Sequence, residues 1–315
     1  MPKLAIVGAG IMGSNHARVA RQLPDVVISH VIDADRQRGE ALARSVGAYF
    51  ETNVEAVLGE VDAAVVAVPT PLHLPVGLML MEAGIHVLME KPIADGVKAA
   101  EQLVAMAHRA EVCFMVGHIE RFNPAVFELQ SIVTSPIHVE AIRVSAFSDR
   151  VVDGVIRDLM IHDLDLTLAI MGSEPTTVSA IAQRVRSDSE DLASALLGFP
   201  SGSTASLIAS RVGQQKIRRV HVTQPDSYVQ ADLVRQDVTI HRVQHAEFLT
   251  DEGRRYSQAG VVEIPYLRHR GEPLGLELAH FVECINGDAR PRVSGADGLR
   301  ALRLAERVRQ SAGLD

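Results

Sequence analysis

Three side chains of this sequence have the types and spacing for acid–base chemistry. Lys91 lies in the tripeptide Glu90-Lys91-Pro92, and Asp158 and His162 lie four residues apart in the segment DLMIHDLD. Because residues i and i+4 share one face of a helix, Asp158 could orient the imidazole of His162, or it could pair with Lys91. A histidine can accept a proton near neutral pH, and a lysine can stabilise negative charge developing on an oxygen. Such a set could take the proton from a hydroxyl group while a hydride leaves its carbon.

A glycine-rich turn near the start of the sequence offers a site for a hydride acceptor. The sequence GAGIMG, residues 8–13, follows the apolar run 4–7 and opens a helix expected over 12–22. In that context the glycines permit a tight turn, close approach of a pyrophosphate and close packing of helix on strand. A tight turn without a ligand is the alternative, which we do not favour. The cofactor-binding residues predicted in this turn are Gly8, Gly10, Ile11, Met12 and Gly13, with the pyrophosphate over Gly10 to Met12.

Asp33 ends the second expected strand, 26–32, about 20 residues after the glycines. A carboxylate there accepts hydrogen bonds from both hydroxyls of an adenosine ribose and repels a 2′-phosphate, so NAD is favoured over NADP as the cofactor. Arg36 and Arg38 are counter-evidence, because either could hold that phosphate. We favour the interpretation that both are exposed helix charges.

Val68-Pro69-Thr70 ends an apolar strand expected at 63–68, and Glu90-Lys91 follows one expected at 86–89. Both segments should therefore lie at the carboxyl edge of a parallel sheet, where ligands bind. His73 either lines the cofactor cleft or caps local backbone, and the sequence leaves both roles open. The cofactor contacts predicted at this edge are Val68, Pro69, Thr70, His73, Glu90 and Lys91.

The segment GHIERFNPAV, residues 117–126, contains polar groups at a strand-to-helix junction. Arg121 and Asn123 could bind a sugar hydroxyl or a phosphate, and Asn123 is also a good helix cap before Pro124. The predicted substrate contacts are Arg121, Asn123, Lys91 and His162.

A metal site is the rival interpretation of the Asp158–His162 pair, since both side chains are metal ligands. No complementary cluster of histidines or cysteines supports it, so we predict no metal. His241 and His245 have similar spacing, but they fall where an expected strand runs into a loop, and we interpret them as structural.

The order of expected elements predicts two domains. Residues 1–120 alternate strands and helices, which indicates a parallel sheet with helices on both faces, that is, a Rossmann dinucleotide-binding domain. Residues 121–315 carry a series of short β-branched runs, which indicates a mostly antiparallel sheet. The polar stretch 244–260 is expected to be a long loop.

Composition excludes some classes of function. The chain has 315 residues, a formal net charge of -8 and only a short basic stretch, which argues against a nucleic-acid partner. No apolar run approaches the length of a membrane span, and no signal peptide is recognised. The two cysteines, Cys113 and Cys284, lie in apolar patterns and are expected to be reduced, as in the cytoplasm.

Taken together, these motifs resemble those of the glucose–fructose oxidoreductase/inositol dehydrogenase/MocA family. The sequence contains the glycine motif of residues 8–13, PxxxH from Pro69 to His73, Glu90-Lys91-Pro92, and DxxxH from Asp158 to His162. The resemblance covers nearly the whole chain. It implies a Rossmann domain, a second α/β domain with a large open sheet, and C-terminal helices that return to the first domain.

The resemblance also implies functions for individual residues. Lys91, Asp158 and His162 correspond to the family's catalytic residues, while Thr70 stands where the family often has Asn. GHIERFNPAV and DLMIHDLD are most similar to dehydrogenases acting at C3 of UDP-N-acetylglucosamine or its uronic acid. Family members are commonly dimers or tetramers that pair through the open sheet, so we expect a homo-oligomer.

Other functions remain open on the sequence alone. The same motifs fit a dehydrogenase of inositol or a free sugar, or a reductase of a nucleotide-linked keto-sugar. A regulatory protein that binds NAD without chemistry would not need Lys91, Asp158 and His162 together. An interaction scaffold that uses the open sheet is a third class.

Overall fold

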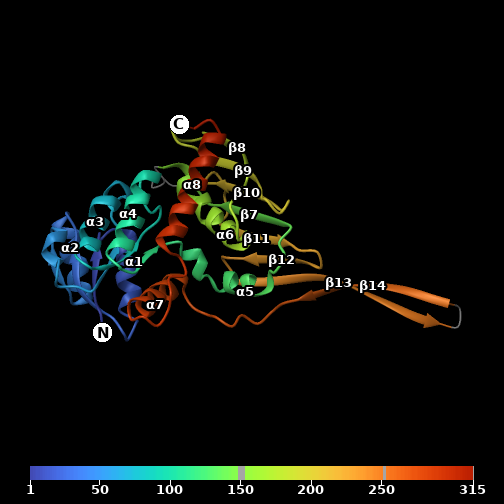
Figure 1. The fold of residues 1–315 in the computed structure, drawn as a ribbon, viewed down its shortest axis with the longest axis horizontal. Coiled ribbons are helices and arrows are strands. Elements are labelled where there is room, and N and C mark those ends of the chain that lie inside the picture. Colours follow the sequence, from blue (N-terminus) through green and yellow to red (C-terminus); the bar gives the residue numbers. More distant parts are fainter. Residues whose placement is uncertain (148–152, 251–252, 315) are drawn as a thin grey trace. The chain divides into compact units, whose positions relative to one another are not determined.

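The computed structural model describes residues 1–147, 153–250 and 253–314, and of residues 244–258 only the backbone. The chain divides into two compact units (Figure 1). Unit 1 consists of Met1–Phe122 and Gly271–Arg303, and unit 2 consists of Asn123–Arg270 and Leu304–Asp315. A C-terminal segment therefore packs with the N-terminal residues, and helix α8 contributes residues to both units.

Unit 1 contains a parallel six-stranded sheet in the order β3-β2-β1-β4-β5-β6. Its strands are β1 (Lys3–Val7), β2 (Val27–Ile32), β3 (Tyr49–Glu51), β4 (Ala63–Val66), β5 (His86–Met89) and β6 (Phe114–Val116). Strands β4 and β6 are entirely buried, which explains their continuous apolar sequences. The strand order reverses between β1 and β4, and ligands of open α/β sheets bind at such a reversal.

Helices and short 3₁₀ turns connect these strands. They are α1 (Ile11–Ala20), α2 (Arg36–Val46), η1 (Val54–Val57), η2 (Thr70–Leu72), α3 (His73–Glu82), α4 (Val97–Arg109), η3 (Ile119–Phe122) and α7 (Pro273–Ile285). Asp35 caps α2 through a bond from the N–H of Arg38 to its carboxylate, and Gly47 ends α2 in the left-handed conformation. The expected order of strands and helices in residues 1–120 is confirmed.

Unit 2 contains an eight-stranded sheet in the order β14-β13-β12-β11-β7-β10-β9-β8. Neighbouring strands are antiparallel except for β7 and β10, which are parallel. The strands are β7 (His138–Val144), β8 (Thr177–Gln183), β9 (Leu192–Gly198), β10 (Thr204–Ser210), β11 (Ile217–Thr223), β12 (Ser227–Asp232), β13 (Asp237–Thr250) and β14 (Gly253–Glu263). The predicted combination of a Rossmann sheet and a mostly antiparallel sheet is therefore confirmed.

The helical elements of unit 2 begin with α5 (Pro124–Ile132), a π-helical turn η4 (Ile156–Met160) and α6 (Ile161–Met171). Helix α8 (Gly295–Ser311) ends in the same unit. A regular helix was expected near 159–171, so the π-helical turn is a feature that the periodicity did not reveal.

The expectation of a long loop over residues 244–260 is wrong. Strands β13 and β14 form a hairpin that is paired in register from Ile240 and Glu263 to Thr250 and Gly253 (Figure 1). The stretch 244–260 lacks the short β-branched runs that indicate the other strands of this sheet, since it contains no Val or Ile. Backbone pairing alone can satisfy the polar groups of a two-stranded ribbon.

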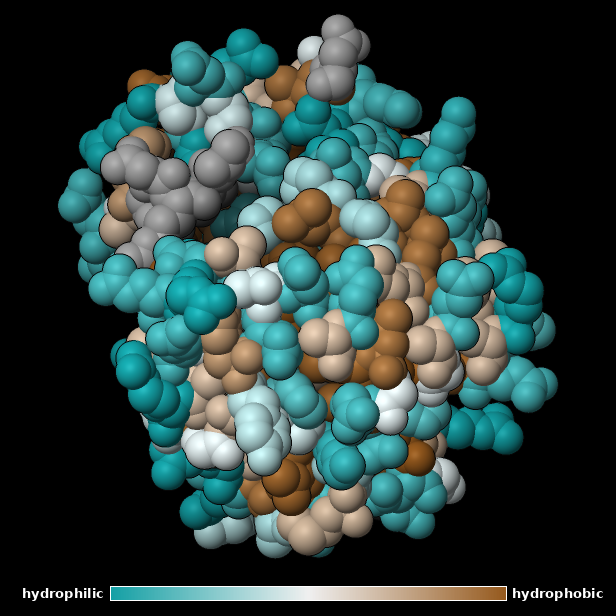
Figure 2. Space-filling model, turned by 90° about the vertical axis from the view of Figure 1, so that its left-hand side faces the viewer, coloured by the Kyte–Doolittle hydropathy of each residue, from teal (hydrophilic) through white to brown (hydrophobic). Residues whose placement is uncertain are grey.

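The surface view in Figure 2 shows hydrophobic residues in patches separated by hydrophilic ones on the face displayed. Within the described part of the chain, no helix is both long and apolar enough to cross a membrane.

Candidate functional site

The glycine turn after β1 has the geometry expected of a dinucleotide loop. Gly8 has a φ of +99°, and a Cβ there would lie 2.6 Å from the carbonyl oxygen of Ala67. A Cβ on Gly13 would collide with the carbonyl oxygen of Gly8, so close packing requires both glycines. A Cβ on Gly10 would meet nothing within 4 Å, so the approach to the backbone at this position is open.

Helix α1 begins at Ile11, with Gly10 at its N-cap and no side chain bonded there. Its first turn contains no acidic residue, and the side chain of Ile11 is exposed. The N–H groups at this end therefore suit a phosphate, which the partial positive charge of the helix N-terminus also favours. The glycine turn and the start of α1 thus fit the pyrophosphate of NAD.

Asp33 is buried at the end of β2 and accepts several hydrogen bonds. The N–H of Ala9 lies 2.6 Å from Oδ2, and the guanidinium of Arg38 binds both carboxylate oxygens, at 2.7 and 3.0 Å. Burial alone would raise the pKa of Asp33, but the bonds from Arg38 and from the N–H groups of Ala9 and Asp35 lower it. Asp33 is therefore ionised, as acceptance of ribose hydroxyls requires.

The two arginines near Asp33 differ in their contacts. Arg36 is an exposed helix charge paired with Glu40 at 3.0 Å, as predicted. Arg38 is also exposed on the helix, as predicted, and it additionally forms a two-point ion pair with Asp33. The sequence spacing of Asp33 and Arg38, five residues across a loop and a helix start, gave no signal for this pairing.

His73 connects the ends of two neighbouring strands of the sheet. Its Nδ1 lies 3.0 Å from the carbonyl oxygen of Pro92 and its Nε2 lies 3.0 Å from that of Val68. Burial lowers the pKa of His73, and the bonds to the two carbonyl groups oppose that effect. Of the two roles left open, anchoring the backbone is the one supported by these contacts. His73 thereby positions the segment Val68–Thr70 against Glu90-Lys91-Pro92.

Glu90 is a buried carboxylate directly before Lys91. Its Oε1 lies 2.8 Å from Nε2 of His16 on α1, and its Oε2 accepts the backbone N–H of Lys91 at 3.2 Å. Burial works against its charge, but the bond from His16 and the charge of Lys91 lower the pKa of Glu90 below its ordinary value. The bond between Lys91 and Pro92 is cis. The sequence motif included Glu90 and Lys91 but gave no sign of His16.

Arg121 and Asn123 are both buried. Nε of Arg292 donates to the carbonyl oxygen of Arg121 at 3.1 Å. Asn123 caps α5, as predicted, by accepting the N–H of Ala125, and its amide nitrogen donates to the carbonyl oxygen of Leu233 at 2.9 Å. Both polar atoms of the Asn123 amide thus serve the fold of unit 2, and its contact with a substrate stays a prediction.

In unit 2, Asp158 lies within the π-helical turn and His162 in the first turn of α6. Both side chains are half-buried. Insertion of a π turn changes the angular offset between residues four apart, and such turns recur at functional sites. The assumption of a regular helix through Asp158 is corrected accordingly.

The start of this helix depends on residues that the motifs did not include. Gly154 has a φ of +77°, and a Cβ there would clash with the carboxyl group of Glu190. The carboxylate of Glu190 faces the N–H of Ile156, and its carbonyl oxygen accepts the N–H of Val155. Glu190 thus caps the segment that carries Asp158.

Asp163 has a structural contact and anchors α6 to the sheet. Nε of Arg143 on β7 donates to its Oδ2 at 2.8 Å, and Nη2 donates to its Oδ1 at 2.8 Å. Both side chains are almost fully buried. This ion pair fixes the helix on which His162 is carried. Among the described residues, no group of three His, Cys, Asp or Glu side chains could hold a metal ion.

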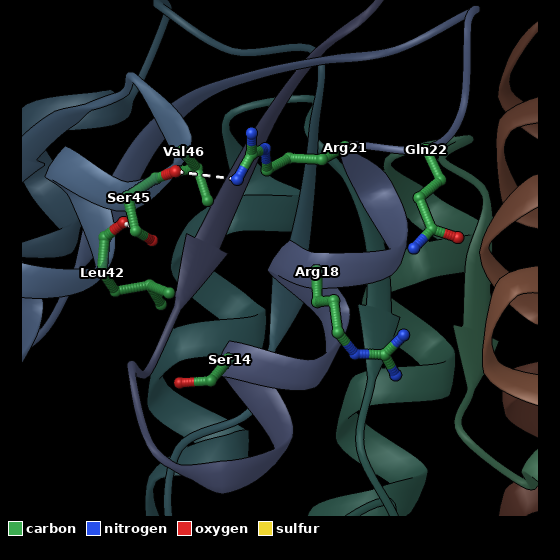
Figure 3. Close-up of a pocket in the computed structure, with 7 residues that line it drawn as sticks. All are labelled: Ser14, Arg18, Arg21, Gln22, Leu42, Ser45 and Val46. Carbon is green, nitrogen blue, oxygen red and sulfur yellow. Dashed lines mark hydrogen bonds between the residues drawn. The ribbon is translucent and has the colours of Figure 1, made fainter.

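A depression of about 320 Å³ lies between α1 and α2, and none of the predicted site residues lines it (Figure 3). Its lining residues are Ser14, Arg18, Arg21, Gln22, Leu42, Ser45 and Val46. Its two arginines are engaged, Arg18 with Glu272 and Arg21 with the carbonyl oxygen of Ser45 at 2.9 Å. We therefore assign it no part in the chemistry.

Comparisons with known proteins agree with this geometry. Residues 3–118 match the GFO_IDH_MocA model, described as an oxidoreductase family with an NAD-binding Rossmann fold. Residues 148–313 match the model of that family's C-terminal alpha/beta domain.

Among curated proteins, the chain is 32% identical to a UDP-N-acetylglucosamine 3-dehydrogenase from Acidithiobacillus ferrooxidans, over 98% of this chain and 96% of that protein. It is 27% identical to an inositol 2-dehydrogenase from Rhizobium meliloti, over 96% of this chain and 94% of that protein. A solved structure of the Acidithiobacillus ferrooxidans enzyme, at 31% identity, covers 98% of this chain and 97% of its own, with a TM-score of 0.88.

Proposed function

This chain belongs to the GFO/IDH/MocA family of NAD-binding oxidoreductases, which act on CH–OH groups, and from that premise we propose that it oxidises C3 of a UDP-N-acetylhexosamine. The observation that carries the proposal is the similarity of almost the whole chain to a UDP-N-acetylglucosamine 3-dehydrogenase. The proposed substrates are UDP-N-acetylglucosamine and its uronic acid.

The residues of unit 1 suit the binding of NAD. The backbone of Gly10, Ile11 and Met12 would hold the pyrophosphate, since a Cβ at Gly10 meets no atom and no side chain caps α1. Asp33 would accept the adenosine ribose hydroxyls, in competition with its bond to Arg38. Val68, Pro69 and Thr70 would lie along the nicotinamide half, with His73 behind them as their anchor. When bound, NAD supplies the acceptor for a hydride.

The acid–base steps are assigned to three residues. His162 takes the proton of the C3 hydroxyl, because a half-buried imidazole is a suitable base near neutral pH. Lys91 donates a hydrogen bond to the same oxygen as negative charge develops on it. Asp158 tunes Lys91 or His162, and Arg121 binds a polar group of the substrate. In ketone reduction, the reverse direction, the same residues return the proton.

The experiment is to follow NADH formation by absorbance with four substrates. They are UDP-N-acetylglucosamine, its uronic acid, myo-inositol and glucose, each with and without 2-oxoglutarate, a keto acid that could reoxidise bound NADH. We expect turnover with a UDP-sugar. Turnover with inositol or glucose alone would replace the proposed substrate but keep the chemistry, consistent with the inositol 2-dehydrogenase relative.

Silence on all four substrates would contradict the proposal. If NAD still bound, as judged by a thermal shift, reduction of a keto-sugar or a regulatory role without chemistry would then be favoured. Loss of NAD binding as well would favour an interaction scaffold.

A further inference from the structure

Helix α7 carries a buried acid that none of the functions assigned above uses. Glu277 is 0% exposed and lies in the same buried face as Leu274, Leu278 and Phe281. Among the described residues, neither oxygen of its carboxyl group has a hydrogen-bond partner. A buried polar group without a partner lowers stability, and an apolar side chain would suit this face of the helix better.

The surroundings of Glu277 connect it to the Glu90–Lys91 segment. Helix α7 packs against α1, which carries His16, and against η3. The carboxyl group of Glu277 interacts electrostatically with that of Glu90. The titratable and charged groups of the neighbouring segments are His16 and Arg18 on α1, Glu90, Lys91, His118, and Glu120 and Arg121 on η3, with His280, Glu283 and Cys284 on α7 itself.

Two buried carboxyl groups that interact electrostatically cannot both be charged without a large cost in free energy. Glu90 has the donors that stabilise a charge, namely Nε2 of His16 and the N–H of Lys91. Among the described residues, no donor contacts the carboxyl group of Glu277, and burial together with the charge of Glu90 raises its pKa well above the ordinary value. The pair therefore carries one charge, on Glu90, and one proton, on Glu277.

We infer that Glu277 is a positioning residue for Lys91, because its neutral carboxyl group leaves Glu90 as the single buried carboxylate beside that lysine. The inference rests on the proposed role of Lys91. If Glu277 lost its proton, a second negative charge would compete with Glu90 for His16 and Lys91. The orientation of Glu90, and with it the backbone of Lys91, would then change. Activity and cofactor binding should therefore weaken at the pH where Glu277 ionises.

The test compares the wild-type protein with Glu277→Gln, which is isosteric and permanently neutral. The matched control is Glu283→Gln on the same helix, where the side chain is exposed. Two quantities are measured across a pH series: kcat/KM for NAD-dependent oxidation of the sugar, and the Kd for NADH from its fluorescence. We expect E277Q to resemble the wild type at acidic pH and to retain turnover and NADH affinity at alkaline pH, where the wild type and E283Q lose both.

Folding provides an independent measurement. A carboxyl group whose pKa is raised by folding destabilises the folded state progressively as pH rises from its unfolded value, about 4.3, toward its folded value. The free energy of unfolding of the wild type should fall over that range. E277Q should lack this fall and be at least as stable at neutral pH. This arm also verifies that the variant folds.

The outcomes separate the two proposals. Superimposable pH profiles of kcat/KM and of NADH affinity for wild type and E277Q would overturn the role of Glu277, even if stability changed. No turnover with any sugar, combined with a difference in the NADH series, would remove the proposed substrate and keep the role of Glu277.

Discussion

At the scale of residues, the sequence motifs located charged side chains but not the side chains that form hydrogen bonds or ion pairs with them. Side-chain type and spacing were enough to predict Lys91, Asp158 and His162 as candidate catalytic residues. The partners His16 and Arg143 come from distant parts of the chain and have no local signal. In the sequence, Glu277 is one polar position in an apolar helix. Only the structure shows that its side chain is fully buried. Pairing across 74 residues, as between His16 and Glu90, depends on the tertiary fold.

Replacement of Lys91 or His162 by alanine tests the assigned chemistry. Each change should lower kcat by about 100-fold or more, because each removes an acid–base or oxygen-stabilising contact. Lys98→Ala, at an exposed position of α4, is the control and should retain normal activity. Steady-state kinetics with saturating NAD provide the measurement. Near-normal turnover in both K91A and H162A would remove these residues from the mechanism.

At the scale of elements, periodicity predicted the strands and helices that have an apolar face. It failed for the polar half of the β13–β14 hairpin, which lacks β-branched runs, and for the π-helical turn, which no residue type marks in the sequence. The turn depends on Gly154 and on the cap from Glu190, which lies 34 residues from Ile156. The position of Asp158 is thus determined by contacts that a local pattern does not contain.

The buried pair of Arg143 and Asp163 should be essential for the attachment of α6. Asp163→Ala leaves the guanidinium buried without its carboxylate and should lower the free energy of unfolding by about 3–5 kcal/mol. Urea denaturation measures this quantity. The double variant R143M/D163L removes both charges and should recover most of the loss. A change below about 1 kcal/mol in D163A would show that the pair does not anchor the helix.

At the scale of the whole molecule, the two-sheet architecture was predictable because alternation of strands and helices indicates a parallel sheet and a series of short strands indicates an antiparallel one. The strand order was not predictable from these patterns, and the parallel pairing of β7 with β10 departs from consecutive hairpins. Strand order β3-β2-β1-β4-β5-β6 places the glycine turn and the Val68 segment on either side of the reversal in the sheet. The composition could not specify how many copies associate.

We expect a homodimer or homotetramer that pairs through the sheet of unit 2. Leu196 and Ile208 lie on one face of adjacent strands and are 54% and 40% exposed. Light scattering after gel filtration should give a multiple of 34.1 kDa. The double variant L196K/I208K should shift the measured mass toward that of one copy. Tyr49→Lys in unit 1 is the control and should leave the mass unchanged. A monomeric wild type would contradict this expectation.

The proposed reaction requires that a hydride leave C3 of a UDP-N-acetylhexosamine. The most direct measurement is isotope transfer from UDP-N-acetylglucosamine deuterated at C3, with substrate deuterated at C4 as the control, followed by mass spectrometry of the NADH formed. We predict deuterium in NADH from the C3-labelled sugar and none from the C4-labelled sugar. Deuterium from C4 alone, or NADH without label from either sugar, would contradict the assignment.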